Sequence, residues 1–266
     1  MSELNGKVAV VTGASRGVGK GVALALAEAG ATVYATGRTV TEDSFATRAT
    51  DGRIIPVRCD HTDDEQVGAA FRRVDDEQRR LDVLVNNVWG GYEQMIVDGV
   101  FTWSLPFWEQ PVWRWDAMFA AGVRASYVAS QHAARVMVAQ GSGLVVNISF
   151  WAAQKHIGNA AYGAAKAATD KLTADAAHEL RGHGVAVVSL YPGLVRTEKV
   201  LEAAAFLDLS NSESPQFVGR AVAALASDAG VMAKSGRVLV AAALAEEYGF
   251  TDVDGGRPRP LTLGEV

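Results

Sequence analysis

Residues 7–36 read KVAVVTGASRGVGKGVALALAEAGATVYAT. The run from Lys7 to Thr12 is apolar and β-branched, which is typical of a strand buried on both faces. A glycine-rich turn follows at once, then residues 20–29 have the composition of a helix that Gly30 ends, and residues 31–36 resemble a second strand. This order favours a dinucleotide-binding unit, because glycines let the backbone approach a pyrophosphate and the helix N-terminus attracts its charge.

Two alternatives for this glycine turn are a phosphate-binding P-loop and a plain turn between two core elements. The P-loop pattern fails because Lys20 is followed by Gly21 rather than by Ser or Thr, and because Ala14 occupies its first glycine position. The flanking strand and helix favour dinucleotide binding over the plain turn.

Tyr162 and Lys166 stand four residues apart in the alanine-rich run from Ala160 to Leu180, which is predicted to be a helix. That spacing places both side chains on one helix face. A phenol titrates near pH ~10 in water, and a nearby ammonium favours the phenolate and lowers that pKa. The pair can therefore form a general acid, although a surface Tyr and a surface Lys on an ordinary helix have the same spacing.

Further strand-like runs alternate with helical segments along the rest of the chain. They are residues 53–60, residues 82–87, a run that ends at residues 147–149, residues 185–191 and residues 236–240. This alternation predicts an α/β fold, a doubly wound parallel sheet of about seven strands with helices on both faces. We expect a single Rossmann-fold domain over residues 1–266, with functional residues at the carboxyl ends of the strands.

Composition limits the function classes. Of the 266 residues, 49% are hydrophobic and 21% are charged, as in a globular protein, and the net charge of −5 argues against nucleic acid or an anionic membrane as partner. Because Cys59 is the one cysteine, neither an intramolecular disulfide nor a Cys-based zinc site is expected, and no metal is predicted. No signal-peptide h-region or membrane-spanning stretch is evident, so a cytoplasmic location is the default expectation, with secretion by another route left open.

The motifs resemble those of the short-chain dehydrogenase/reductase family. The glycine turn has the spacing T-G-x-x-x-G-x-G over residues 12–19, and it is followed in family order by Asn147-Ile148-Ser149, by the Tyr162 and Lys166 pair, and by PGLVRT at residues 192–197. This resemblance implies an oxidoreductase that uses NAD(P)(H) to interconvert a carbonyl and an alcohol. It places Ser149, Tyr162 and Lys166 at the catalytic centre.

In carbonyl reduction the resemblance gives each of these residues a role. Tyr162 would donate a proton to the developing alkoxide, Ser149 would orient the same oxygen, and Lys166 would hold the nicotinamide ribose and lower the pKa of Tyr162. One departure concerns Gly122, which stands where many family members have a catalytic Asn that helps to hold a relay water. A glycine there is expected to leave room for an additional water.

A second departure is Asn87-Val88-Trp89-Gly90, where the family usually reads N-N-A-G. With Gly122, it narrows the resemblance to the dehydrogenase/reductase member 1 subgroup. Mammalian members of that subgroup are associated with NADPH-dependent reduction of steroids and xenobiotic carbonyls. That association implies a bulky apolar ketone or aldehyde as substrate.

The end of the second strand predicts NADP(H) rather than NAD(H). Gly37-Arg38-Thr39 stands there in place of the carboxylate that would bind a ribose 2′-hydroxyl. Arg38 and Arg16 can instead pair with a 2′-phosphate. Both arginines could equally be solvated surface residues. His61 could likewise be a solvated loop residue. By resemblance, the residues expected to bind the cofactor are Gly13, Ser15, Arg16, Gly17, Val18, Gly19, Arg38, Asp60, His61, Asn87, Val88, Ile148, Tyr162, Lys166, Pro192, Gly193, Val195 and Thr197.

Three segments are expected to lie outside the common core: an aromatic inserted loop at residues 91–115, a substrate lid at residues 198–215 and a C-terminal tail at residues 252–266. All six tryptophans fall between residues 89 and 151, where they can line an apolar pocket or pack the loop onto the body. The candidate substrate residues are Trp89, Trp151 and Phe206.

Two predicted helices, residues 113–139 and residues 160–181, carry many small residues. These can pack onto the sheet, whereas in the family the same helices form a subunit interface, so a homodimer or homotetramer is expected. The leading interpretation is an NADP(H)-dependent carbonyl reductase. The alternatives are an NADP-binding sensor or interaction protein with impaired catalysis, which only Gly122 supports, and an alcohol dehydrogenase that works oxidatively.

Overall fold

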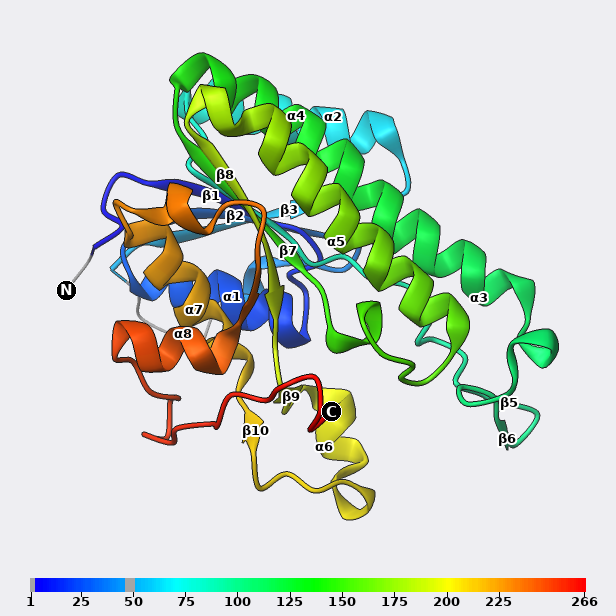
Figure 1. The fold of residues 1–266 in the computed structure, drawn as a ribbon. Coiled ribbons are helices and arrows are strands. Elements are labelled where there is room, and N and C mark those ends of the chain that lie inside the picture. Colours follow the sequence, from blue (N-terminus) through cyan, green and yellow to red (C-terminus); the bar gives the residue numbers. More distant parts are fainter. Residues whose placement is uncertain (1–2, 46–50) are drawn as a thin grey trace.

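A seven-stranded parallel sheet forms the centre of the computed structural model, which describes residues 3–45 and 51–266 (Figure 1). The strands lie in the order β3-β2-β1-β4-β7-β8-β11, and each neighbouring pair is parallel. The strands of this sheet are β1 (Val8–Val11), β2 (Thr32–Gly37), β3 (Arg53–Arg58), β4 (Val83–Asn86), β7 (Gly143–Ile148), β8 (Val185–Tyr191) and β11 (Val238–Val240). The predicted fold class is therefore confirmed.

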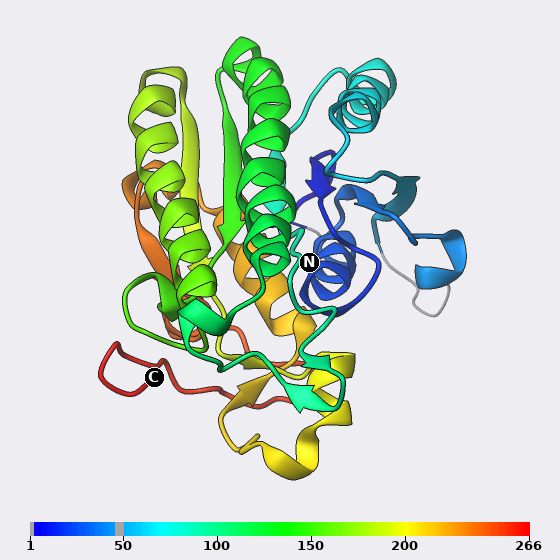
Figure 2. The same cartoon turned by 90° about the vertical axis from the view of Figure 1, so that its right-hand side faces the viewer.

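Helices cover both faces of the sheet (Figures 1 and 2). One face packs against α1 (Gly17–Glu28), α7 (Pro215–Ser227) and α8 (Ala241–Tyr248). The other face packs against α2 (Asp64–Gln78), α4 (Ala125–Gln140) and α5 (Ala160–Leu180). The alternation along β1 shows why both layers form, because Val8 and Val10 enter one core while Ala9 and Val11 enter the other.

Glycines bring α1 and α7 into close contact. A Cβ on Gly21 would lie 2.2 Å from the carbonyl carbon of Pro215, and a Cβ on Gly219 would lie 2.6 Å from Cβ of Ala25. Neither position has room for a larger side chain. The start of α7 is fixed further by Ser214, whose hydroxyl accepts a hydrogen bond from Phe217 N at 3.1 Å. The glycine turn that precedes α1 is thereby held on a rigid pair of helices.

A segment of π-helix interrupts the long helix that precedes β7. The helix begins as α3 (Val112–Ala117), continues as the π-segment η3 (Met118–Arg124) and becomes α4. The wider π-turn falls on Gly122, the residue at which the sequence departs from the family pattern. Such segments occur often at functional sites, and this one runs past the end of β4 that carries Trp89.

Three irregular regions gather at the carboxyl ends of the strands. Residues 91–115 form the hairpin β5 (Ile96–Val97) and β6 (Val100–Phe101), followed by the short helix η2 (Phe107–Glu109). Residues 198–215 contain α6 (Glu198–Glu202), η6 (Ala204–Phe206) and β10 (Ser212–Glu213), which pairs with β9 (Leu194–Val195). The tail beyond Asp252 passes beside the segments that contain β9 and β10, since Arg196 pairs with Asp252 and Asp254 and Asn211 hydrogen-bonds with Arg259. The remaining short helices are η1 (Glu42–Phe45), η4 (Trp151–Ala153), η5 (Arg181–His183) and η7 (Val231–Lys234).

Within residues 3–45 and 51–266, none of the helices combines the length and apolar character needed to cross a bilayer.

Candidate active site

Ser149, Tyr162 and Lys166 come together at the carboxyl end of the sheet. Ser149 directly follows β7, and the other two residues lie in the first two turns of α5. The Asn159 side chain caps α5 by accepting a hydrogen bond from Tyr162 N at 3.0 Å, and Ser149 Oγ donates to the Lys166 carbonyl oxygen at 3.4 Å. Because Ser149 is 2% exposed and the other two are each 7% exposed, the three residues form one buried site.

The ammonium group of Lys166 has two close neighbours. Its Nζ lies 3.2 Å from the Ile148 carbonyl oxygen, to which it donates, and 3.9 Å from the centroid of the Trp89 ring. Burial lowers the pKa of Lys166 from an ordinary 10.5 to about 7, and the negative charge of Asp170 opposes this shift. Near neutral pH the lysine is therefore divided between its charged and neutral forms.

Aromatic rings enclose the phenol of Tyr162. The ring centroids of Trp103, Trp89, Tyr92 and Phe150 lie 5.3, 5.6, 6.2 and 6.3 Å from its own. Two of these rings come from the inserted segment 91–115, which therefore covers the candidate proton donor. The enclosure is aromatic, and its polar group is the Tyr92 hydroxyl, which hydrogen-bonds with Tyr162.

This enclosure sets the protonation of Tyr162. Burial raises the pKa of its phenol well above 10, and the neighbouring phenol of Tyr92 adds to the rise. The net shift is therefore upward and is dominated by burial, and the lowering of this pKa by Lys166 stays a prediction. Tyr162 keeps its proton at neutral pH, which is the form that a proton donor needs.

The space beside Gly122 is filled by an indole. A Cβ on Gly122 would lie 2.6 Å from Cζ3 and 2.8 Å from Cε3 of Trp89. The expectation that Gly122 leaves room for an additional water is therefore wrong. The indole Nε1 is buried, and within the described part of the chain it has no hydrogen-bond partner, so no hydrogen bond fixes the orientation of the ring.

Asp170 and Tyr191 belong to the surroundings of the site, and sequence reasoning misses both. The Tyr191 hydroxyl donates to Asp170 Oδ2 and accepts a hydrogen bond from Gln154 Nε2 at 3.3 Å. A signal for Asp170 is present in the sequence, because it stands four residues after Lys166 and so shares its helix face. Tyr191 carries no such signal, since its contact with α5 depends on how β8 packs.

The glycine turn packs closely against the loop that follows β4. Gly13 and Gly17 have φ of +66° and +54°, and a Cβ on Gly13 would lie 3.0 Å from the Val88 Cα. A Cβ on Gly19 would lie only 2.4 Å from Asn87 Nδ2, which donates to the Gly13 carbonyl oxygen at 3.1 Å. The loops after β1 and β4 are therefore locked together at the start of α1.

The end of β2 presents Arg38 to solvent, and Arg16 at the start of α1 is also exposed. The charge of Arg38 contributes to lowering the pKa of the Asp60 carboxyl, after the larger effect of the hydrogen bonds from Thr62. His61 is 3% exposed, its Nε2 lies 2.7 Å from Thr36 Oγ1, and burial lowers its pKa to about 4. It is thus a neutral interior histidine, whereas the arginines are free to meet a ligand.

The loop after β8 carries the remaining predicted cofactor residues. Thr197 Oγ1 caps α6 by accepting from Val200 N at 3.4 Å. Beside Gly193 lies the carboxyl of Glu213, which is 1% exposed, and burial raises its pKa to about 8. The predicted cofactor residues follow the carboxyl ends of the strands: Gly13, Ser15, Arg16, Gly17, Val18 and Gly19 after β1, Arg38 after β2, Asp60 and His61 after β3, Asn87 and Val88 after β4, Ile148 at the end of β7, and Pro192, Gly193, Val195 and Thr197 after β8.

The three candidate substrate residues lie in different surroundings. Trp89 contacts Tyr162 and Lys166 directly. Trp151 is 8% exposed and packs edge-on against Tyr191, with ring centroids 5.1 Å apart. Phe206 is 90% exposed in the segment 198–215. The structure therefore brings only Trp89 of this set onto the candidate proton donor.

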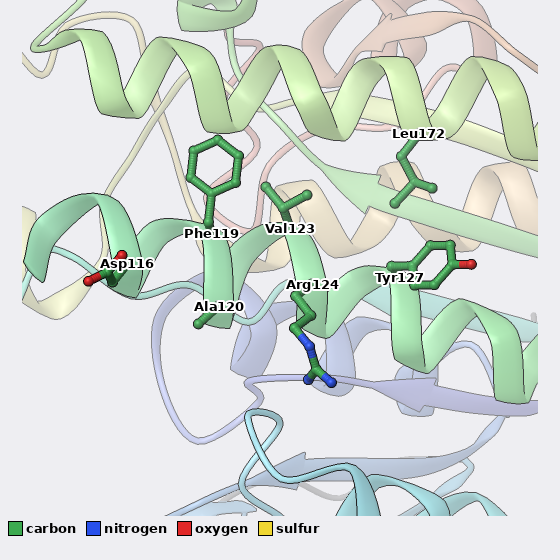
Figure 3. A pocket seen from close by; sticks show the side chains of 7 residues that line it. All are labelled: Asp116, Phe119, Ala120, Val123, Arg124, Tyr127 and Leu172. Carbon is green, nitrogen blue, oxygen red and sulfur yellow. The ribbon is translucent and has the colours of Figure 1, made fainter. Parts of the chain in front are cut away.

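A separate apolar hollow lies between the α3–η3–α4 helix and α5 (Figure 3). In Figure 3, Phe119 and Val123 point toward α5, whereas Leu172 points back toward them. The residues that line it are Asp116, Phe119, Ala120, Val123, Arg124, Tyr127 and Leu172. None of these is a predicted catalytic or cofactor residue, so the hollow is a feature of the helix face rather than of the candidate active site.

Comparisons with known proteins agree with this geometry. Residues 7–206 match the family described as short chain dehydrogenase. Dehydrogenase/reductase SDR family member 1 of Mus musculus is 44% identical over 275 aligned residues, which cover 97% of this chain and 86% of that protein. Cis-4-hydroxycyclohexanecarboxylate dehydrogenase of Sinomonas cyclohexanicum is 33% identical and covers 93% of this chain and 97% of its own.

The solved structures include a short-chain type dehydrogenase/reductase from Mycobacterium marinum. Its TM-score is 0.75 at 29% identity, with 90% of this chain and 95% of that chain covered. The resemblance stated from the sequence motifs is therefore confirmed at the level of the family and of its fold.

Proposed function

The chain belongs to the short-chain dehydrogenase family, and from that premise we propose that it is an NADP(H)-dependent oxidoreductase that reduces bulky apolar ketones or aldehydes. Membership establishes the coarser part, an oxidoreductase that interconverts carbonyls and alcohols with a nicotinamide cofactor. The observation that carries the substrate class is the set of aromatic rings that enclose the phenol of Tyr162 beside Ser149 and Lys166. A proton-bearing acid in an aromatic enclosure suits reduction of an apolar carbonyl.

The residues present fit a dinucleotide. Gly13, Gly17 and Gly19 let the turn pack against Asn87, Val88 and Thr197, where a Cβ would be crowded, and the turn leads into the N-terminus of α1. The N–H of Gly17 already donates to a carboxylate, that of Glu198, at 3.0 Å. This contact supports an anion-binding role for the turn, which would hold the pyrophosphate.

Arg38 supports NADP(H) over NAD(H). The guanidinium is exposed directly after β2, at the place where the family reads the adenosine ribose. A 2′-phosphate would receive charge-assisted hydrogen bonds from Arg38 and from Arg16 across the glycine turn. We therefore propose NADP(H) as the cofactor, held by the loop residues that follow β1, β2, β3, β4 and β8.

The chain's own residues manage the proton and the position of the substrate. When bound, the nicotinamide supplies the hydride. Tyr162 would give its phenolic proton to the carbonyl oxygen as negative charge develops there. Ser149 Oγ, which now donates to the Lys166 carbonyl oxygen, would donate to the same substrate oxygen. Lys166 would hold the ribose hydroxyls, and its charged form would stabilise the phenolate that remains.

The substrate class rests on the enclosure around Tyr162. The rings of Trp103 and Tyr92, from the inserted segment, and of Phe150 pack around the Tyr162 ring, and the Tyr92 hydroxyl is the polar group among them, because it hydrogen-bonds with Tyr162. The relative from Sinomonas cyclohexanicum is named for a substrate that carries a cyclohexane ring. We propose that a cyclic or aromatic ketone fills the corresponding space in this protein.

The test is consumption of NADPH, with NADH beside it, across a panel of cyclic ketones, quinones and aldehydes. Tyr162→Phe should abolish turnover, because it removes the phenolic hydroxyl that donates the proton. The dissociation constant for NADPH should stay at the wild-type value. Tyr248→Phe is the matched control, since Tyr248 lies at the end of α8, on the face of the sheet opposite to α5. Undiminished turnover in Tyr162→Phe contradicts the mechanism, whereas tight NADPH binding without any turnover favours the sensor alternative.

We also propose that the protein forms a homodimer or homotetramer through α4 and α5. The support is the apolar hollow between the η3–α4 helix and α5, into which Val123 and Leu172 both point (Figure 3). Tyr127 beside them is 48% exposed. A second copy of the same face would cover this surface.

A further inference from the structure

Trp89 and Gly122 are complementary in shape. The indole six-membered ring lies where a Cβ of residue 122 would stand, with Cζ3 and Cε3 at 2.6 and 2.8 Å from that point. An indole and a side chain at position 122 therefore exclude each other. Each residue departs from the common pattern of its own motif. In the structure, the indole of Trp89 fills the space that a side chain at position 122 would need.

The indole also touches both candidate catalytic groups on α5. Its face lies 3.9 Å from Lys166 Nζ, and its ring meets that of Tyr162 at 83°, with centroids 5.6 Å apart. A cation held over the face of a tryptophan is attracted by the ring quadrupole, and the attraction grows when the pair is away from water. At 7% exposure, Lys166 meets that condition.

The other groups around the Lys166 ammonium come from three elements. The Ile148 carbonyl oxygen accepts its hydrogen bond from the side of β7. Tyr162 and Asp170 face it from α5, and Tyr191 of β8 donates to Asp170. The ammonium has three N–H donors, and one carbonyl cannot satisfy all of them. Among the described residues, the ring face of Trp89 is the second close partner of the ammonium, after the Ile148 carbonyl oxygen.

We propose that Trp89 is a positioning residue for the reduction, and that its indole holds the Lys166 ammonium beside Tyr162 from the volume that Gly122 leaves open. The proposal rests on the proposed function, because it assigns Trp89 a task in that reaction. In this arrangement the indole contacts Lys166 and does not contact the substrate. Gly122 is then needed so that the indole fits, and its presence does not mean that catalysis has been lost.

The test is a double-mutant cycle over these two residues, made from the wild type, Trp89→Ala, Gly122→Asn and the double variant. Trp89→Ala should lower kcat about thirtyfold, equivalent to about 2 kcal/mol, with little change in KM for NADPH. Gly122→Asn should lower kcat as well, because its side chain collides with the indole. The double variant should recover at least about tenfold over the product of the two single effects, since the amide enters the vacated volume and can serve the ammonium.

Two further variants separate positioning from mere packing. Trp89→Phe keeps a ring face toward Lys166 and should retain kcat to within about threefold of the wild type. Trp108→Ala, which removes a tryptophan that is 72% exposed, should leave kcat unchanged. The pH dependence of kcat should move in Trp89→Ala and return toward the wild type in the double variant, because the ammonium is the group that the indole contacts.

The outcomes are distinguishable from failure of the proposed function. If the wild type shows no Tyr162-dependent reduction, the proposed function itself is wrong. If the wild type is active but the two single effects multiply in the double variant, Trp89 does not position Lys166. A coupling that appears in the free energy of unfolding of the cofactor-free proteins, and not in kcat or its pH dependence, also overturns the inference, since it shows packing alone.

Discussion

The carboxylate of Glu198 accepts a hydrogen bond from the backbone N–H of Gly17, with 3.0 Å between Gly17 N and Glu198 Oε2. Gly17 is the first residue of α1, so its N–H belongs to the positive end of that helix. The carboxylate thus occupies a position that suits an anion. Binding of a pyrophosphate at the same helix end requires Glu198 to withdraw.

Glu198→Gln should therefore tighten binding of NADPH. The amide lacks the negative charge that competes with the pyrophosphate, and we expect the dissociation constant to fall about threefold to tenfold, with the larger effect at low salt. Fluorescence titration of NADPH at two ionic strengths measures this. Glu202→Gln, one turn further along α6, is the control and should change the constant little. Weaker binding in Glu198→Gln would contradict the argument.

Arg38→Asp should reverse the preference between the two nucleotides. The substitution removes a cation and places a carboxylate after β2, where it repels a 2′-phosphate and can accept from a ribose hydroxyl. We expect the ratio of kcat/KM for NADPH to that for NADH to fall about a hundredfold. Arg237→Asp, on the exposed turn before β11 at the opposite edge of the sheet, is the matched control. An unchanged ratio would show that Arg38 does not read the cofactor.

Glu213 should make the stability of the wild type fall as pH rises. Burial raises the pKa of this carboxyl from an ordinary 4.5 to about 8. Between these two values the unfolded chain has released a proton that the folded chain retains, so the free energy of unfolding declines with pH and levels off above about 8.

Glu213→Gln removes this titration and should be more stable than the wild type by a few kcal/mol at pH 9, with a smaller gain at pH 5.5. Urea unfolding at both pH values measures the difference. Glu246→Gln, on the exposed side of α8, should show no such gain. A difference of equal size at both pH values would mean that the charge of Glu213 is not the cause.

Leu172→Glu should separate the subunits. The side chain points into the apolar groove between α4 and α5, and a buried carboxylate on each side of a symmetric interface is costly (Figure 3). Light scattering after gel filtration should give the mass of two or four chains for the wild type and of one chain for the variant. Leu263→Glu in the tail, at a residue 41% exposed, serves as control. An unchanged mass would place the interface elsewhere.

The sequence predicts the strand ends well, because strands buried on both faces, such as residues 8–11 and 185–191, read as uninterrupted apolar runs. The meeting of Ser149 with Tyr162 and Lys166 could also be expected, since the motifs that contain them end one strand and begin one helix. The upward shift of the Tyr162 pKa could not, because it depends on how completely the surrounding side chains remove the phenol from water. The filling of the space at Gly122 likewise depends on the rotamer of Trp89, a residue from a different loop.

Tyr92 and Trp103 lie over a phenol that is only 7% exposed, which has a consequence for the kinetics. We predict that a substrate reaches Tyr162 through displacement of the segment 91–115, so that association proceeds through the fraction of molecules in which this segment is displaced. This displacement of the segment 91–115 is the same for every substrate. Good substrates of different structure should therefore converge on a common upper limit of kcat/KM that lies well below the diffusion limit and is set by the opening equilibrium rather than by the chemistry.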